Sequence, residues 1–179
     1  MGSIPRGGPA LATGQVPADV VAYKQDIFVS DAANNVIWKI NTSSGYETVF
    51  AGNGTAGHAG DGGPAQAAEL NHPAGMAIDA AGDLFIADAG NNRVREVTSS
   101  DGHIHVIAGS GITGFGGDGG KAVKAKLYYP SAVACRGHKL YIADSFNNRV
   151  RVVDMRTGLI TTVAGDGTHG DSGDGGPAT

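Results

Sequence analysis

Aspartate and asparagine side chains recur at fixed spacing in this chain, and they are its first candidates for chemistry. An aspartate followed by two adjacent asparagines occurs at Asp31 with Asn34 and Asn35, at Asp88 with Asn91 and Asn92, and at Asp144 with Asn147 and Asn148. A further aspartate recurs in GDGG segments, as Asp61, Asp118 and Asp174. Carboxylate and amide oxygens could bind a hard cation or hydrogen-bond a partner. The alternative is structural, because these side chains bond nearby backbone N–H groups and tolerate left-handed conformations in tight turns.

A calcium site is the most specific chemistry that these groups suggest. Asp166, Asp171 and Asp174 lie in one glycine-rich loop, which suits an oxygen-seeking cation. The two related loops carry Asn53, His58 and Asp61, or Ser110, Phe115 and Asp118, at these positions, so only the GDGG aspartate is kept in every loop. The loop also lacks the bidentate acid that ends an EF-hand loop. We therefore expect no cofactor, with these three aspartates as weak calcium candidates.

The remaining reactive side chains form no catalytic set. Three segments match GxGxxG, but further turn residues follow where a dinucleotide site needs a long helix. His103 and His105 could form an adventitious metal pair, although surface histidines are the expected interpretation. Arg93 and Arg149 should each make a bidentate structural contact with an aspartate of the same or a neighbouring turn. No nucleophile–base pair can be named, so catalytic residues are not expected.

Composition narrows the class of protein. The 179-residue chain is 41% hydrophobic and carries a net charge of −4, with histidines neutral. That balance argues against nucleic-acid binding, which needs clustered Lys and Arg. No apolar run approaches the ~20 residues that span a bilayer, so no membrane insertion is expected. Cys135 is the only cysteine, which excludes an internal disulfide and a cysteine zinc cluster.

The elements that carry these residues repeat along the chain. The segment at residues 51–63 returns at 108–120 and 164–176, and the aspartate–asparagine motif keeps the same period. In the middle unit we expect a short helical turn and then strands a to d: 64–70, 75–79, 83–88, 92–97 and 103–107. Four short antiparallel strands bury both faces by stacking around an axis as propeller blades. We expect an all-β fold with three blades per chain, approximately 9–63, 64–120 and 121–179.

The sequence resembles NHL repeats, a family of six-bladed β-propellers. The resemblance rests on residues 73–94 and 130–150, which share an apolar first strand, an IAD strand end and an NNRV segment. The glycine-rich connector ending in GDGG is similar to that of NHL arrays, including the teneurin propeller. The resemblance implies a propeller but no particular activity. Some six-bladed relatives are lyases, whereas most NHL domains bind proteins or RNA.

Three blades are too few to close a ring, because known propellers have at least ~4. The chain starts with a GGPA segment and ends with another, so its two ends share one phase of the repeat. Two copies joined head-to-tail would give three plus three blades with continuous register. We expect a homodimeric six-bladed ring. The alternative is a piece of a longer chain in which the missing blades are covalent.

The connectors and the turns between strands b and c should share one face of the propeller, because strand b returns to the face where the connector arrives. We expect this acidic, amide-rich rim to be the binding face. Its candidate residues are Asp31, Asn35, Asp88, Asn92, Arg93, Asp144, Asn148 and Arg149, with His58, Phe115 and Asp171 at one diverging connector position.

Three hypotheses of function remain. The leading one is a non-catalytic scaffold that recognises a protein or a carbohydrate. The second is a metal-assisted lyase or hydrolase with a cation in the central channel. The third is purely architectural, a propeller fragment with no ligand of its own. The compartment is left open by the residues, and we favour a secreted or cell-surface protein of a bacterium.

Overall fold

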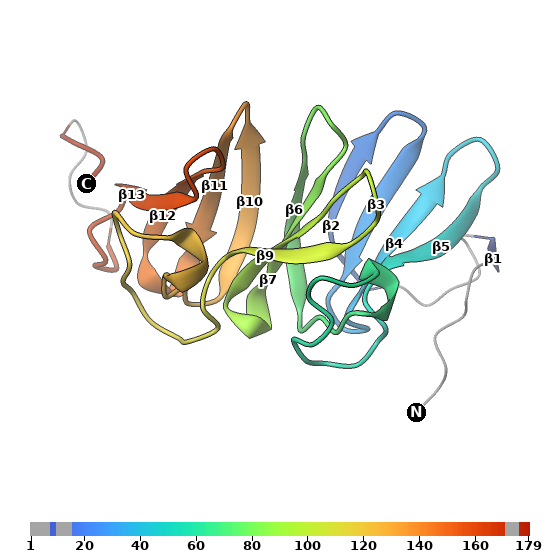
Figure 1. The fold of residues 1–179 in the computed structure, drawn as a ribbon, viewed down its shortest axis with the longest axis horizontal. Coiled ribbons are helices and arrows are strands. Elements are labelled where there is room, and N and C mark those ends of the chain that lie inside the picture. The colour runs from blue at the N-terminus through green and yellow to red at the C-terminus, as the bar shows by residue number, and fades with distance from the viewer. Residues whose placement is uncertain (1–7, 10–15, 171–175) are drawn as a thin grey trace.

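The computed structural model describes residues 8–9, 16–170 and 176–179, and these form three antiparallel sheets lying side by side (Figure 1). Each sheet contains four consecutive strands, here lettered a to d and together called a blade, and one sheet has a fifth strand, β1 (Gly8–Pro9), at its edge. The blades comprise β2 (Pro17–Tyr23), β3 (Asp26–Asp31), β4 (Val36–Asn41) and β5 (Tyr46–Ala51); β6 (Pro73–Ile78), β7 (Leu84–Asp88), β8 (Arg93–Val97) and β9 (Ile104–Ala108); and β10 (Pro130–Arg136), β11 (Lys139–Asp144), β12 (Arg149–Asp154) and β13 (Leu159–Ala164). The expected all-β fold with four strands per repeat is confirmed.

The strands form because short β-branched and aromatic runs alternate with glycine and asparagine turns. All three blades share two breaks in register, one near the start of strand a and one between strands c and d. The second break falls just before Trp38, Arg95 and Arg151 in the respective blades. A bulge of this kind re-aims the side chain beside it. The three blades therefore share their two register shifts as well as their strands.

Two connectors, residues 52–72 and 109–129, join the blades and lie at one end of the sheets, together with the b–c turns (Figure 1). They contain the short 3-10 helices η1 (Ala65–Ala67) and η3 (Ala122–Lys124), and the b–c turns contain η2 (Ala89–Asn91) and η4 (Ser145–Asn147). Each connector folds back on its own start, since Ala65 O accepts from Gly52 N at 2.9 Å and Ala122 O from Gly109 N at 3.0 Å. The divisions expected at 63/64 and 120/121 fall within these connectors.

Gly109 shows why the connectors need glycine where they leave a blade. Its φ is +90°, and an added Cβ would lie 2.3 Å from Asn92 O. No side chain fits that approach, and the backbone conformation itself is one that residues other than glycine rarely adopt. Gly52 repeats this contact with Asn35 O at 2.3 Å. The connector therefore lies directly against the b–c turn.

The hydrophobic core lies between adjacent blades. Phe28 of the first blade packs with Ile86 of the second, and Phe85 of the second packs with Ile142 of the third. Each connector adds a fully buried leucine to the interface it crosses, Leu70 or Leu127. Burial of one such side chain contributes ~1.5–3 kcal/mol. Stacking of blades, with the connector as part of the contact, is what stabilises the fold.

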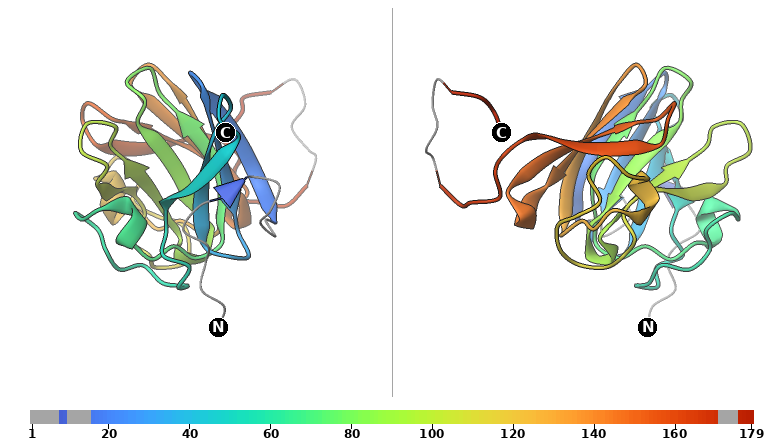
Figure 2. Two further views of the ribbon diagram at one scale, coloured as in Figure 1. Left: turned by 90° about the vertical axis from the view of Figure 1, so that its right-hand side faces the viewer. Right: turned by 60° about the vertical axis from the view of Figure 1, so that its left-hand side comes forward.

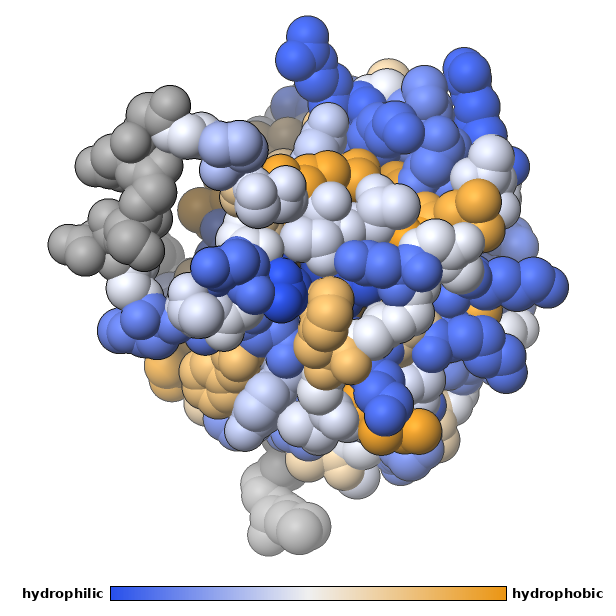
Figure 3. All heavy atoms as spheres, turned by 90° about the vertical axis from the view of Figure 1, so that its left-hand side faces the viewer, coloured by the Kyte–Doolittle hydropathy of each residue, from blue (hydrophilic) through white to orange (hydrophobic). Residues whose placement is uncertain are grey.

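The outer faces of the first and third blades differ from the internal ones. Tyr141 of the third blade is 36% exposed, whereas Phe85, at the same register position in the second, is 0% exposed. On the opposite side, Val20 of the first blade is 59% exposed, against 4% for the equivalent Met76. Figure 2 turns each end blade toward the viewer in turn. Figure 3 shows apolar groups among polar ones on the third-blade end.

The edge of the first blade carries one additional strand. β1 (Gly8–Pro9) pairs with β5, placing Pro9 opposite Tyr46. Connector residues occupy the same place on the other blades, where Pro64 pairs with His103 and Lys121 with Leu159. Gly8–Pro9 therefore lies against strand d as a connector does. No helix within the described ranges has the length and apolarity needed to cross a membrane.

Candidate functional site

The connectors and the b–c turns form one surface, which we call the connector face. Asn91 Nδ2 donates to Gly57 O at 2.6 Å, and Asn147 Nδ2 donates to Gly114 O at 2.8 Å. Each b–c turn is thus bonded to the connector that precedes its blade. This is the face on which the sequence places a binding site, and its residues divide into a buried polar layer and an exposed layer.

Asp88 and Asp144 belong to the buried layer. Asp144 accepts from Tyr128 N at 2.7 Å, Asn147 Nδ2 at 2.8 Å and Arg151 Nη1 at 3.2 Å. Asp88 repeats all three contacts, and neither carboxylate is exposed. Burial raises the pKa of Asp88, and its hydrogen bonds and Arg95 oppose that change. The rim is therefore not acidic at these positions, because the carboxylates point inward and are neutralised.

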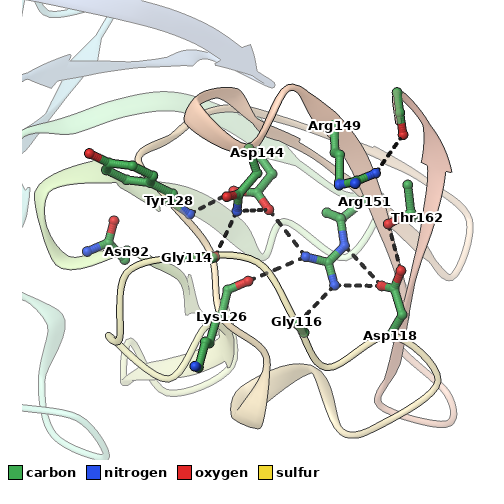
Figure 4. A network of polar contacts seen from close by, with 12 residues as sticks. Asn92, Gly114, Gly116, Asp118, Lys126, Tyr128, Asp144, Arg149, Arg151 and Thr162 are labelled. Carbon is green, nitrogen blue, oxygen red and sulfur yellow. Dashed lines mark hydrogen bonds and ion pairs between the residues drawn. The ribbon is translucent and has the colours of Figure 1, made fainter. Parts of the chain in front are cut away.

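Arg95 and Arg151 are the cations at the centre of this layer, and both are fully buried. Arg151 reaches Asp144 from Nη1 and Asp118 from Nη2, at 3.2 and 2.6 Å (Figure 4). It also donates to the backbone oxygens of Lys126 and Gly116 at 3.4 and 3.3 Å. One guanidinium thus ties the GDGG turn of the connector to the b–c turn of the following blade. Arg95 makes the same link between Asp61 and Asp88, at 2.7 and 3.2 Å.

The link affects the connector carboxylate. Although partial burial opposes the change, hydrogen bonds from Thr162 and Arg151 lower the pKa of Asp118. Thr162 Oγ1 donates to Asp118 at 2.7 Å, so the connector is also bonded to strand d. Asp118 is therefore ionised at neutral pH and is fully engaged within the protein.

The arginines expected to make these contacts, Arg93 and Arg149, lie elsewhere. Arg149 donates to the backbone oxygens of Gly165 and Asp166 at 2.9 and 2.5 Å, and Arg93 reaches Asp61 only at 3.8 Å. The two arginines of each R-V-R segment lie on the same side of the strand because side chains alternate. The strand pattern therefore does not tell which of the two pairs with the aspartate. The signal that could have done so is Trp38, a donor at the same position in the first blade.

The second asparagine of each motif has a structural role in the backbone of the b–c turn. Asn35, Asn92 and Asn148 have φ of 57°, 53° and 50°, the left-handed region that asparagine tolerates. Asn92 Oδ1 accepts from Tyr129 N at 2.9 Å, and Asn35 Oδ1 accepts from His72 N at 3.0 Å. These two asparagines therefore brace the connector that follows their blade. A ligand-binding role for the candidate asparagines stays a prediction.

The first blade has a different version of the buried layer. Asp31 is buried and accepts from Asn34 Nδ2 at 2.8 Å and from Trp38 Nε1 at 3.2 Å. The indole therefore takes the place of the arginine. Its single donor serves Asp31, and the described residues show no ion pair at this position.

The exposed layer is concentrated beside the third blade. Phe115 is 45% exposed and lies under Arg149, with the guanidinium carbon 4.1 Å from the ring centroid. Phe146 is 59% exposed and contacts Tyr128 edge-on at 5.0 Å and Tyr129 by stacking at 5.1 Å. Of the sequence candidates His58 is also exposed, whereas Asp171 falls outside the described residues. Sequence analysis did not single out Tyr128 or Phe146.

The described part of the structure includes only one of the three calcium candidates, Asp166. Within the described ranges, no three His, Cys, Asp or Glu side chains are arranged to hold one. The Asp166 carboxylate accepts from Thr168 N and Oγ1 at 2.8 and 2.6 Å, and these bonds lower its pKa. The other two calcium candidates, Asp171 and Asp174, fall in the part that is not described. His103 lies beside Asp101 at 3.2 Å, with no such cluster around it.

Comparison with known proteins identifies the repeat. Residues 18–115 match the family model described as the Teneurin NHL domain, which is more than half of the chain. The chain belongs to this NHL domain family. The buried Asp–Arg links are thus found in an NHL domain, and the resemblance expected from the repeat is confirmed.

Individual relatives agree with this assignment. The human NHL repeat-containing protein 2 is 34% identical over 128 residues, which is 66% of this chain and 18% of that protein. Human Teneurin-4 is 34% identical over 109 residues, covering 53% of this chain and 4% of that protein. This NHL domain therefore spans less than a fifth of the curated relatives it matches. A solved nidogen/laminin complex has the same fold, with a TM-score of 0.59 at 22% identity over 84% of this chain and 48% of that one.

Proposed function

We propose that this NHL domain is a non-catalytic recognition scaffold whose connector face binds a protein partner. The observation that carries the proposal is the division of that face into two layers. The repeated charged groups, such as Asp144 and Arg151, are buried in contacts within the chain. The residues that differ between repeats, such as Phe115 and Phe146, are exposed above them. A rigid base with a variable exposed layer suits recognition.

Selection of peptides on the immobilised domain tests this function. A random peptide library would be panned, and the peptides recovered would be measured against Phe115→Ser and Phe146→Ser. A substitution at the opposite end of the blades, Arg156→Ser in the turn between β12 and β13, is the matched control. We expect the two connector-face changes to weaken binding by about tenfold, ~1.4 kcal/mol, and the control to leave it unchanged. Binding that the control weakens as much as the connector-face changes do would overturn the proposal.

Metal analysis separates the scaffold from an enzyme. Protein prepared without nickel would be assayed for bound calcium and zinc before and after chelation. The scaffold function predicts substoichiometric metal. A stoichiometric ion removable by chelator, together with turnover that depends on it, would favour a metal-assisted lyase or hydrolase instead.

We further propose that two copies join head-to-tail into a six-bladed ring. The exposure of Tyr141 and Val20, at positions that are buried between blades elsewhere, supports this contact. Light scattering after gel filtration should give about twice 18.0 kDa, and Tyr141→Glu should return the mass to 18.0 kDa. A stable 18.0 kDa species at all concentrations would contradict dimeric closure and leave closure by further covalent blades.

A further inference from the structure

The two connectors share a backbone course but carry opposite charge. Connector 52–72 contains two acids, Asp61 and Glu69, and no Lys or Arg. Connector 109–129 contains one acid and three lysines, Lys121, Lys124 and Lys126. Among the residues that the structure describes, none of these lysines forms an ion pair, whereas the acid Asp118 is paired with Arg151. The second connector is thus a local positive surface on a chain whose net charge is −4.

The positive charges lie on one side of the connector, next to an aromatic ring. Residues 124 to 128 alternate between exposed and buried, so Lys124, Lys126 and Tyr128 point outward while Ala125 and Leu127 point into the core. Figure 4 shows the Lys126 carbonyl turned toward Arg151 and its side chain turned away. The outward row of this connector therefore reads lysine, lysine, tyrosine.

Contacts extend this row in both directions. Phe146 N donates to Tyr128 O at 3.1 Å, and their rings meet edge-on. At the other end, Lys126 pairs with Gly116, which places Phe115 and the Arg149 above it beside the row. We call Phe115, Lys124, Lys126, Tyr128, Phe146 and Arg149 the basic–aromatic patch. Its equivalents in the preceding repeat are His58, Ala67, Glu69, Asn71, Gly90 and Arg93.

Among the described residues, no acid forms an ion pair with Lys124 or Lys126 of this patch. Asp118 and Asp144 are taken up by Arg151, and the Asp166 carboxylate is bonded to Thr168. Arg149 donates to backbone oxygens, and it interacts electrostatically with the Asp166 carboxylate without a hydrogen bond between the two side chains in the described residues. Phe146 is held by two ring contacts while much of its surface stays exposed. An aromatic residue that is already fixed loses little conformational entropy when a partner packs on it.

We propose that the basic–aromatic patch binds an acidic peptide segment of a partner protein, with apolar side chains packed on Phe146 and Tyr128 and carboxylates beside Lys124 and Lys126. This inference rests on the proposed recognition function and names the chemistry of its partner. Charge complementarity favours an anionic ligand. A peptide fits better than a nucleic acid, because three lysines on a net-negative chain fall short of the 6–10 phosphate contacts typical of nucleic-acid binding.

Fluorescence anisotropy with defined probes tests the proposal on the whole chain. The probes are a labelled peptide of alternating glutamate and phenylalanine, the same peptide with lysine for glutamate, and a labelled single-stranded RNA. Two variants introduce the residues of the preceding repeat: the double variant Lys124→Ala with Lys126→Glu, and Phe146→Gly. The double variant Arg136→Ala with Arg156→Glu, at the opposite end of the blades, matches the charge change as a control. Circular dichroism and thermal melting confirm that every variant is folded.

We expect the glutamate peptide to bind more tightly than the lysine peptide, and each patch variant to weaken it about tenfold, ~1.4 kcal/mol. The control should not alter binding. Binding lost equally in the control would overturn the site. Tighter binding of RNA than of the glutamate peptide, lost in the lysine variant, would overturn the ligand class.

The library selection distinguishes failure of this inference from failure of the scaffold function. Selected peptides that depend on His58 and Glu69, with no binding of the glutamate peptide, would overturn the patch while keeping the recognition function. Absence of any connector-face binder would overturn both.

Discussion

The first blade and the third blade hold the same aspartate in different ways. In the first, Trp38 Nε1 donates to Asp31 at 3.2 Å, and in the third, Arg151 Nη1 donates to Asp144 at the same distance. The guanidinium has further donors, and it uses them on Asp118 and on connector backbone. The indole has a single N–H and can serve only one acceptor.

This difference separates two tasks that the arginine performs together. Satisfying the buried carboxylate of the b–c turn requires one donor, and either side chain supplies it. Fastening the preceding connector requires a second, charged arm, and only arginine supplies that. The third blade therefore depends on its connector through an ionic contact that the neutral indole of Trp38 cannot make in the first blade.

Removal of the buried carboxylate should have the largest effect and should break the equivalence of the two blades. Asp144→Ala leaves the buried Arg151 without one of its two carboxylate partners and Tyr128 N without its acceptor. We expect a loss of ~3–5 kcal/mol in unfolding free energy. Asp31→Ala leaves only neutral donors unpaired and should cost ~1–3 kcal/mol. Chemical denaturation measures both, and equal losses would contradict the comparison.

Removal of the connector carboxylate, Asp118, tests only the contact that fastens the connector to the third blade. Asp118→Asn should cost ~1–2 kcal/mol, less than a buried pair, because 37% of the Asp118 side chain is exposed. The lowered pKa of Asp118 means that its contribution is present above the ordinary value of 3.8 and is lost as the pH falls through the lower folded-state pKa.

The difference in stability between wild type and Asp118→Asn should therefore be constant near neutrality and shrink below pH 3.8. Thermal melting between pH 2 and pH 7 measures it. A difference that grows as the pH falls would show that the carboxylate does not stabilise the connector.

A loss no larger than that of Asp118→Asn should come from removal of the asparagine that braces the next connector. Asn92→Ala should cost ~1–2 kcal/mol, from the left-handed backbone at φ 53° and the lost bond to Tyr129 N. Asn92→Gly relieves the backbone and should recover about half of that loss. If glycine and alanine destabilise equally, the hydrogen bond alone accounts for the role of Asn92.

The fold followed from the sequence because its signals are local and repeated. The period of the GDGG segments and the turn residues between β-rich runs predict four strands per unit, and the apolar strands predict stacking. The helical turn expected at 64–70 is present as η1. The repeat could not predict which connector residue contacts each strand. The contact between Arg95 and Asp61, for example, depends on how the connector lies over the blade.

The candidate site was predicted less completely. Asp88 and Asp144 lie on the predicted face but are buried, because each turns inward to an arginine seven residues later, at the third position of the next strand. The basic–aromatic patch was missed because a net charge of −4 averages over the chain. Lys124, Lys126 and Tyr128 become one surface only when the extended segment fixes their alternation, and Phe146 joins them from another turn.

The pairing of Gly8–Pro9 with β5 has a kinetic consequence for the proposed joining of two copies. The edge beside Tyr46 is where an incoming connector would lie by analogy with Pro64 and Lys121, and it is already occupied from within the chain. Joining a second copy would therefore be a displacement reaction rather than a simple encounter. Its rate would rise with concentration only until release of the resident strand became limiting, and a plateau in the assembly rate would be the mark of that exchange.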